Sequence, residues 1–396
     1  MVASKNLSWL LWAVSLVTAP AAAGRIPKRD EFTQEEIVEG NALSALASLA
    51  YNETVPIVSA KARRTFGGSC NLGNLKIRRE WRTLSVAERK SYISAVKCLR
   101  TKPSLLAPGV APGSKSLFDD FVVIHLQQTL FIHLTVSPSY PPPAPTYTNV
   151  PSPPTTEPQL THVAPQGSFL TWHRYFTHVY ETHLNQCGYN GAIPYWEWGL
   201  DVNNPAASPV FDGSATSLGG NGQYIPHSGL ILTEPLNPAA LIPLPAGSGG
   251  GCVTTGPFAN MVVNIGAVAL AQYGSTDVYA APDALADGNQ RCLKRDLNAG
   301  VAKRYTSFLN TTSLILNNNN IEKFQAVMQA DPRYVHGELG VHGGGHFTMG
   351  GDPGGDPFIS PGDPAFFLHH GQIDRVYWIW QMLDFNNRKV CDSSLA

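Results

Sequence analysis

The sequence has few charged residues. Only 14% of its 396 residues are charged, and 28 Lys and Arg nearly balance 29 Asp and Glu, which gives a formal net charge of −1. Because there is no basic surplus, the composition does not indicate binding to nucleic acid or to an anionic membrane surface. Proline and glycine are plentiful instead, with 31 and 36 residues. This composition fits a compact, loop-rich protein better than a coiled coil or a disordered chain.

Long hydrophobic runs are missing beyond the N-terminus. The run from Leu7 to Thr18 is apolar, follows Lys5 and precedes Ala21-Ala22-Ala23, an order that is typical of a secretory signal peptide. It is too short to span a bilayer. We therefore predict that residues 1–23 are a signal peptide, that the protein is secreted, and that it has no membrane partner.

A dibasic pair, Lys28-Arg29, follows this segment. We interpret residues 24–29 as a propeptide that ends at the pair, which leaves residues 30–396 as a single domain with a sizeable core. The alternative is that the pair is simply two solvated charges. Sequons at Asn52 and Asn310 agree with export and predict a glycoprotein.

Cysteines are few, and no CxxC pair occurs, which argues against a zinc ribbon or a thioredoxin-like site. In an exported protein they are expected to form disulfides. The six are Cys70, Cys98, Cys187, Cys252, Cys292 and Cys391.

Helical periodicity is the clearest local signal. Ser85-Val-Ala-Glu88 predicts a helix start, because the hydroxyl and the carboxylate can each satisfy a free backbone N–H group. Gly188 is predicted to end another helix. The predicted helices cover 30–52, 85–99, 118–134, 173–186, 296–330 with a break at 317–320, and 364–384.

Twelve histidines provide the candidate chemistry. His342 and His346 lie four residues apart, so both rings lie on one side of a helix. Three glycines separate them, which is costly in a helix, so we expect another group to approach the backbone there. The glutamate of a HExxH motif is missing, which argues against a zinc protease.

His369 and His370 are adjacent, and consecutive helical side chains diverge by about 100°. Only one of them is therefore expected to face a metal ion. Asp374 shares the face of His370, where its carboxylate could orient ligands from behind. We assign His370 as the ligand and His369 as its neighbour.

Two longer stretches carry a family resemblance. They are Gly167-Ser-Phe-Leu-Thr-Trp-His-Arg-Tyr-Phe176 and Asp363-Pro-Ala-Phe-Phe-Leu-His-His-Gly-Gln-Ile-Asp-Arg375. They resemble the two copper-binding signatures of the tyrosinase and catechol oxidase family, in its short secreted fungal type. The resemblance implies a mainly α fold, an antiparallel four-helix bundle with long irregular loops and few short strands. It also implies two copper ions, one held by His125, His133 and His173, the other by His342, His346 and His370.

The resemblance further implies a copper oxidase of o-diphenols (catechols) or o-aminophenols, which gives o-quinone products and reduces O2 to water. Its partners are then a small phenolic substrate and O2, and no protein nucleophile is needed. Phe347, Phe367 and Gly343 would shape the substrate entrance. Hydroxylases of monophenols often have Asn where this chain has Gly343, which predicts weak or no monophenol hydroxylation. Position 131 is Phe, so no thioether crosslink to His133 is expected.

Three other readings stay open at this point. A hemocyanin-like O2-binding protein would have the same ligands and a shielded site, but export as one small domain argues against it. The chain could also be inactive if its first copper site is broken. A mononuclear zinc hydrolase lacks the carboxylate base that it would need.

The first signature is interrupted. His133 and His173 lie 40 residues apart, whereas the family spacing is nine, and removal of residues 136–166 restores it. These 31 residues contain ten prolines. We interpret them as a translated intron; the alternative is a genuine Pro-rich surface loop. In the second case His162 would rival His133 as a ligand.

The C-terminal residues 390–396 also depart from the family pattern, because the family normally continues for several tens of residues. We interpret this tail as intron read to a stop codon, which would make Cys391 non-native and leave Cys292 without its partner. The disulfides that we expect are Cys70–Cys98 and Cys187–Cys252.

Overall fold

A computed structural model of the chain describes residues 26–64, 73, 75–133, 168–234, 237–332 and 334–388. The predicted signal peptide, the 136–166 insertion with His162, and the 390–396 tail lie outside the described residues, as does Cys70. Among the described helices, none combines the length and the apolar character that a membrane crossing requires.

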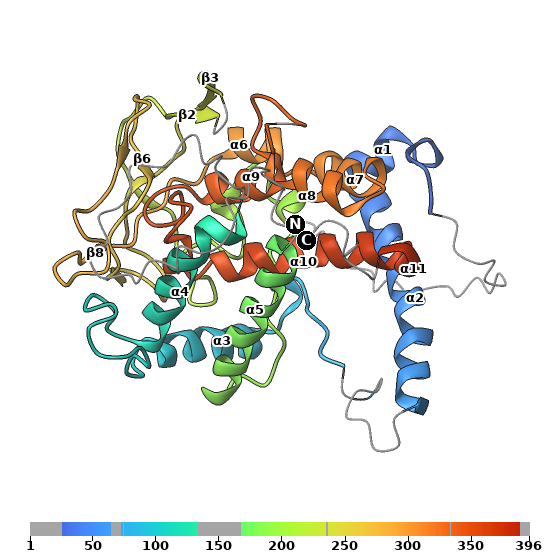
Figure 1. The fold of residues 1–396 in the computed structure, drawn as a ribbon, viewed down its shortest axis with the longest axis horizontal. Helices are drawn as coiled ribbons and strands as arrows, with labels where there is room; N and C mark the ends of the chain where they lie inside the picture. Colours follow the sequence, from blue (N-terminus) through green and yellow to red (C-terminus); the bar gives the residue numbers. More distant parts are fainter. Residues whose placement is uncertain are drawn as a thin grey trace, which may run out of the picture.

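The fold is mainly helical with a few short strands, as the resemblance implied (Figure 1). The α-helices are α1 (Gln34–Val38), α2 (Asn41–Arg64), α3 (Val86–Leu99), α4 (Leu117–Ile132), α5 (Phe169–Gln186), α6 (Ala299–Tyr305), α7 (Phe308–Asn317), α8 (Ile321–Gln329), α9 (Gly340–Met349), α10 (Phe366–Met382) and α11 (Phe385–Arg388). Short 3-10 turns are η1 (Arg29–Glu31), η3 (Trp81–Thr83), η4 (Trp198–Leu200), η5 (Pro205–Ala207) and η6 (Ser360–Gly362).

The strands form two-stranded antiparallel ribbons on one side of the helices (Figure 1). Their pairs are β1 (Gly222–Tyr224) with β4 (Gly250–Val253), β2 (Leu230–Glu234) with β3 (Asn237–Leu244), β5 (Val262–Val263) with β8 (Arg291–Cys292), and β6 (Leu270–Ala271) with β7 (Val278–Tyr279). Each pair is too small to have a core of its own, so the ribbons depend on packing against the helices.

Local signals explain where the helices begin. The Ser85 hydroxyl accepts a hydrogen bond from the Glu88 amide at 3.2 Å, and the Glu88 carboxylate accepts one from the Ser85 amide at 2.7 Å, so the predicted capping box is confirmed. The predicted break at 317–320 is also confirmed, because Asn320 caps α8. A second break was missed: the Ser307 hydroxyl accepts a hydrogen bond from the Asn310 amide and starts α7.

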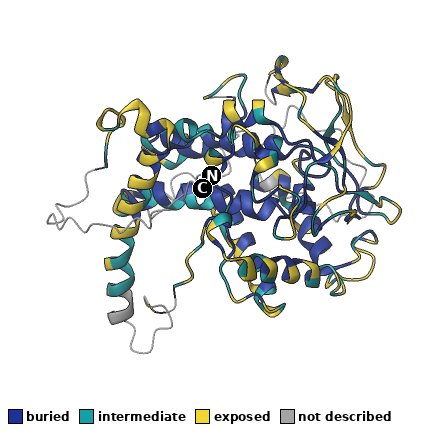
Figure 2. Cartoon of the chain, turned by 180° about the vertical axis from the view of Figure 1, so that it is seen from behind, coloured by how far each residue is buried: buried dark blue, intermediate teal, exposed yellow. Residues whose placement is uncertain are grey.

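Helix α10 lies at the centre of the molecule, where it packs against α2, α5, α7 and α9 (Figures 1 and 2). Its residues are largely buried, whereas much of α2 is exposed (Figure 2). The aromatic core beside it includes Phe367, whose ring stacks on Tyr180 at 3.5 Å and 3°. Burial of such side chains supplies most of the driving force for folding, so α10 is well placed to hold functional side chains rigidly.

The disulfides differ from the predicted ones. The structure pairs Cys98 with Cys187 and Cys252 with Cys292, so both expected pairs are wrong and Cys292 does have a partner. The physical reason is helix and strand packing. Cys98 lies in the last turn of α3 and Cys187 caps α5, and these two helices pack together. Cys292 lies on β8, and Cys252 pairs through a β-bridge with Lys294, just after that strand.

Candidate metal centre

Four helices bring seven histidines together in two groups. The first group contains His125 on α4, His133 at its C-terminal end, and His173 on α5. The second contains His342 and His346 on α9 with His369 and His370 on α10. Within each group the nitrogen atoms that can bind a metal lie within 4.8 Å of one another. All six predicted ligands are thus near each other, and His369 joins them although it was predicted to turn away.

In the first group, backbone carbonyls fix the direction of two imidazoles. The Nδ1 atoms of His125 and His173 each lie 2.8 Å from a carbonyl oxygen, that of Phe358 and that of Phe169 respectively. If Nδ1 donates its hydrogen there, Nε2 keeps its lone pair for a metal. The two Nε2 atoms lie 3.4 Å apart. The buried His133 Nε2 meets no hydrogen-bond partner among the described residues.

The second group has a similarly close spacing of ring nitrogens. The Nε2 atoms of His342 and His346 lie 3.2 Å apart. Both ring nitrogens of His370 are buried without a hydrogen-bond partner among the described residues. The His370 ring stacks on that of His173, with 4.3 Å between centroids and 14° between planes. This stacking places the two groups directly beside each other.

Burial keeps these imidazoles neutral. It lowers the pKa of His125 to about 4 and that of His346 to about 3. The pKa values of the other members are also well below the ordinary value, because burial acts first and neighbouring imidazoles add to it. Neutral imidazole is the form that binds a metal ion.

The donor sets fit small transition-metal ions. Two nitrogens bound at about 2.0–2.1 Å in tetrahedral geometry lie about 3.3 Å apart, and the closest pairs here are separated by 3.4 and 3.2 Å. Neutral imidazoles suit copper, zinc, iron and nickel. Neither group contains a carboxylate or a thiolate, so the charge of a bound ion would not be neutralised by its ligands.

The glycines between His342 and His346 allow close packing on two sides of α9. A Cβ atom at Gly344 would lie 2.4 Å from the Tyr305 Cβ, and one at Gly345 would lie 2.2 Å from the His369 ring. The expected close approach to this backbone is therefore present, and its partners are a side chain of α6 and one of α10.

The predicted entrance residues lie in different environments. Gly343 and Phe347 are half-buried on α9. Phe367 is fully buried against Tyr180, so its expected place at the entrance is corrected: it is a core residue. The sequence could not distinguish it, because neighbouring positions of α10 point either to the site or to the core.

Asp374 connects the elements around the site. Its carboxylate forms ion pairs with Arg174, the residue after His173, and with Arg78. It is thus bound to two arginines that the sequence did not point to, and it links α10, which carries His370, to α5, which carries His173.

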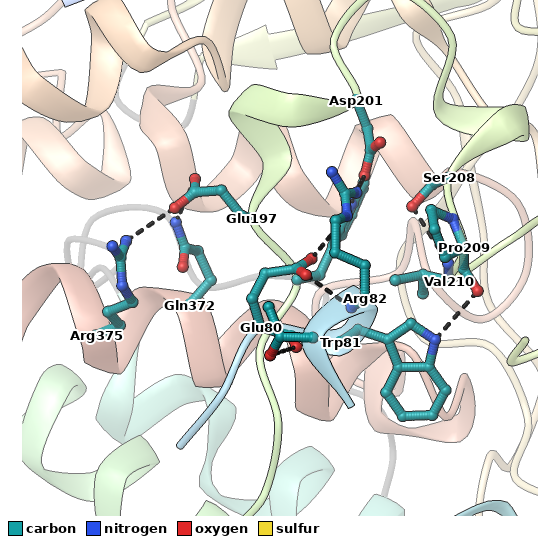
Figure 3. Close-up of polar contacts among 12 residues, drawn as sticks. Glu80, Trp81, Arg82, Glu197, Asp201, Ser208, Pro209, Val210, Gln372 and Arg375 are labelled. Atoms are coloured by element: carbon teal, nitrogen blue, oxygen red, sulfur yellow. Dashed lines mark hydrogen bonds and ion pairs between the residues drawn. The ribbon is translucent and has the colours of Figure 1, made fainter. Parts of the chain in front are cut away.

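A second polar network, also missed from the sequence, holds the other side of α10 (Figure 3). The Glu197 carboxylate accepts hydrogen bonds from Gln372 at 2.7 Å and Arg375 at 2.8 Å. Nearby, Arg82 binds both Glu80 and Asp201. The sequence did not indicate these contacts, because the partners are far apart along the chain. Trp198, next to Glu197, packs its ring 5.3 Å from that of His369.

Comparisons with known proteins agree with this geometry. Residues 115–383 match the family model described as the common central domain of tyrosinase. A tyrosinase-like protein, orsC, of Emericella nidulans is 37% identical over 81% of this chain and 78% of its own length. N-acetyl-6-hydroxytryptophan oxidase ivoB of the same species is 35% identical, with coverages of 86% and 82%. The solved structure of a mutant polyphenol oxidase from Thermothelomyces thermophila is similar with a TM-score of 0.73 and 40% identity, over 88% of this chain and 81% of that one.

Proposed function

The chain belongs to the tyrosinase family of copper-dependent oxidoreductases, and we propose that it oxidises o-diphenols or o-aminophenols to o-quinone products. His125, His133 and His173 would hold one copper ion, and His342, His346 and His370 the other. When bound, the copper pair supplies the redox chemistry, the binding of O2 and its reduction to water. The observation that supports the proposal best is the adjacency of two buried groups of neutral imidazoles.

The protein's own residues then act by positioning. Carbonyls of Phe358 and Phe169 orient two imidazoles. No carboxylate lies in either histidine group, so bound ions would keep their positive charge, which would attract the electron-rich oxygen of a phenol. Two of the relatives named above have the names of oxidases that act on phenolic compounds, which agrees with this substrate class.

Gly343 and Phe347 form the part of α9 that is accessible beside the ligands. Gly343 has no side chain that could accept a proton from a monophenol. We therefore propose oxidation of o-diphenols with weak or no hydroxylation of monophenols. We further propose export after removal of residues 1–23 and 24–29, with glycans on the exported protein.

The proposal is tested by metal analysis and oxygen uptake on the copper-loaded protein. We expect two copper ions per chain and O2 consumption with catechol. His342→Ala should lose one ion and the activity, whereas His178→Ala, at an exposed position of α5, should lose neither. Two ions without catechol turnover would identify an O2-binding protein instead. Fewer than two ions in the unaltered chain would mean that its first site is broken.

A further inference from the structure

His369 lies in the middle of the second histidine group, although the adjacent His370 was the expected ligand. Its ring centroid lies 4.5 Å from that of His346, 5.0 Å from that of His370 and 5.7 Å from that of His342. The side chain is fully buried. It therefore lies beside all three proposed ligands of the second ion.

The ring of His369 fits a notch in α9. A Cβ atom on Gly345 would lie 2.2 Å from its Cε1, 2.3 Å from its Nδ1 and 3.2 Å from its Nε2. These distances are far below van der Waals contact, so the ring occupies the volume that any side chain at position 345 would need. The ring of Trp198 packs nearby, 5.3 Å away, and limits its movement.

One nitrogen of the His369 ring lies within 4.8 Å of a nitrogen of His342, His346 and His370, so the orientation of the ring, and not its distance, has to separate a spacer from a ligand. Cε1 and both nitrogens form the outer edge of the imidazole, and this edge faces the backbone of α9 at Gly345. Among the described residues neither nitrogen has a side-chain hydrogen-bond partner, while the backbone of His342, also on α9, interacts with the ring as a hydrogen-bonding group. The ring thus contributes its shape, whereas His370 turns toward His173.

We propose that His369 is a positioning residue, a spacer that occupies the notch at Gly345 and sets the distance between α9 and α10. This distance decides whether His342 and His346 on α9 converge with His370 on α10. The inference rests on the proposed function, because it assigns a role toward the second copper ion. It also explains why glycine is needed at position 345.

A suppressor experiment tests the contact. Gly345→Ala should lower the melting temperature of the copper-free full chain and reduce copper from two ions to about one per chain. Adding His369→Ala removes the ring that the new methyl group meets, so the double variant should regain melting temperature relative to Gly345→Ala alone, while its copper content stays below two ions per chain because the spacer is missing. The matched control is Gly344→Ala, whose methyl group meets Tyr305 instead; His369→Ala should not rescue it. A double variant no better than Gly345→Ala alone overturns the proposal.

A second variant distinguishes a spacer from a seventh ligand. His369→Phe fills the same space without nitrogen atoms, so we expect two copper ions per chain and an unchanged absorption spectrum of the loaded centre. Loss of one ion in this variant would make His369 a ligand and overturn the proposal. The melting temperatures are measured on the copper-free chain and do not depend on copper binding. Failure of the unaltered chain to bind copper would therefore count against the proposed function, while the rescue would still test the spacer.

Discussion

At the scale of single residues, burial acts differently on two kinds of side chain. The buried imidazoles become neutral and able to bind metal, whereas buried carboxylates become reluctant to ionise. Burial raises the pKa of Glu80 to about 7, although Arg82 opposes the shift, and the negative charges of Asp201 and Glu197 add to it. The carboxyl group therefore holds its proton well above its ordinary value of 4.5.

This shift predicts a pH dependence of stability. The folded chain keeps a proton on Glu80 that the unfolded chain loses above about pH 4.5. The free energy of unfolding should therefore fall as pH rises from about 4.5 to 7, and this loss of stability should be complete above about pH 7. Glu80→Gln stays neutral, so its stability relative to the unaltered chain should rise over this window by as much as about 3 kcal/mol. Urea denaturation at several pH values measures it.

The control for this experiment is Glu53→Gln, at an exposed position of α2. Its stability should follow the pH profile of the unaltered chain. Parallel profiles for Glu80→Gln and the unaltered chain would show that Glu80 ionises normally in the folded protein.

At the scale of elements, the contacts of Asp363, just before α10, explain the start of the second signature. Asp363 accepts a hydrogen bond from the Ala365 amide at 2.8 Å and forms a fully buried ion pair with Arg295 at 2.7 Å. Arg295 also donates to the carbonyl groups of residues 218–220. Aspartate at this position thus fastens the helix that carries His370 to the loop region of the ribbons.

We predict that Asp363→Asn destabilises the protein strongly, because it leaves the Arg295 guanidinium buried without its counter-ion. Loss of one partner of a buried ion pair costs about 3–5 kcal/mol. Guanidinium denaturation of the copper-free chain measures the change. Asp287→Asn, which breaks an exposed ion pair with Lys115, should leave the denaturation midpoint in place. Equal denaturation midpoints for both variants would show that the ion pair of Asp363 with Arg295 does not stabilise the fold.

The described residues on either side of the 136–166 insertion lie close together. The ring of His133, at the end of α4, lies 5.5 Å from that of Phe169, the first residue of α5. Without the insertion, four residues would join them: Leu134, Thr135, Gly167 and Ser168. Such a connection can extend roughly 3.3–3.6 Å per residue, which is well beyond the 5.5 Å that separates the two rings.

We therefore predict that deletion of 136–166 preserves two copper ions per chain and does not lower the melting temperature. The intron interpretation itself is tested by peptide mapping of the natural protein, where a tryptic peptide should join Thr135 to Gly167. A loss of copper on deletion, or natural peptides from inside the segment, would instead make the insertion a genuine loop.

The same elements show how far the sequence could lead. Spacing alone indicated that His342 and His346 share a face, because helical geometry is local. The Ser85 cap and the break before Asn320 were predictable for the same reason. The position of His369 and the Glu197 network were not, since both depend on how α9, α10 and the loop at 197–201 pack in space. The prediction of the disulfide pairs failed for the same reason.

At the scale of the whole molecule, two disulfides connect parts that are far apart in the sequence. Cys98–Cys187 closes a separation of 89 residues between α3 and α5. Cross-links over such distances restrict the unfolded chain and typically contribute about 2–4 kcal/mol. His173 lies 14 residues before Cys187 on α5, or about 20 Å along the helix, so the cross-link is remote from the candidate metal centre.

We therefore predict that Cys98→Ser with Cys187→Ser lowers the free energy of unfolding by about 2–4 kcal/mol and leaves two copper ions per chain. Denaturant titration and metal analysis of the same preparation measure both quantities. The Cys252–Cys292 disulfide closes a shorter separation of 40 residues. Cys252→Ser with Cys292→Ser should therefore lower the free energy of unfolding somewhat less, since the entropy of loop closure grows slowly with loop length. Non-reducing peptide maps must show both pairs. Loss of copper in the first double variant would mean that the cross-link positions α5 at the metal centre, and an unchanged midpoint would mean that packing of α3 on α5 is sufficient without it.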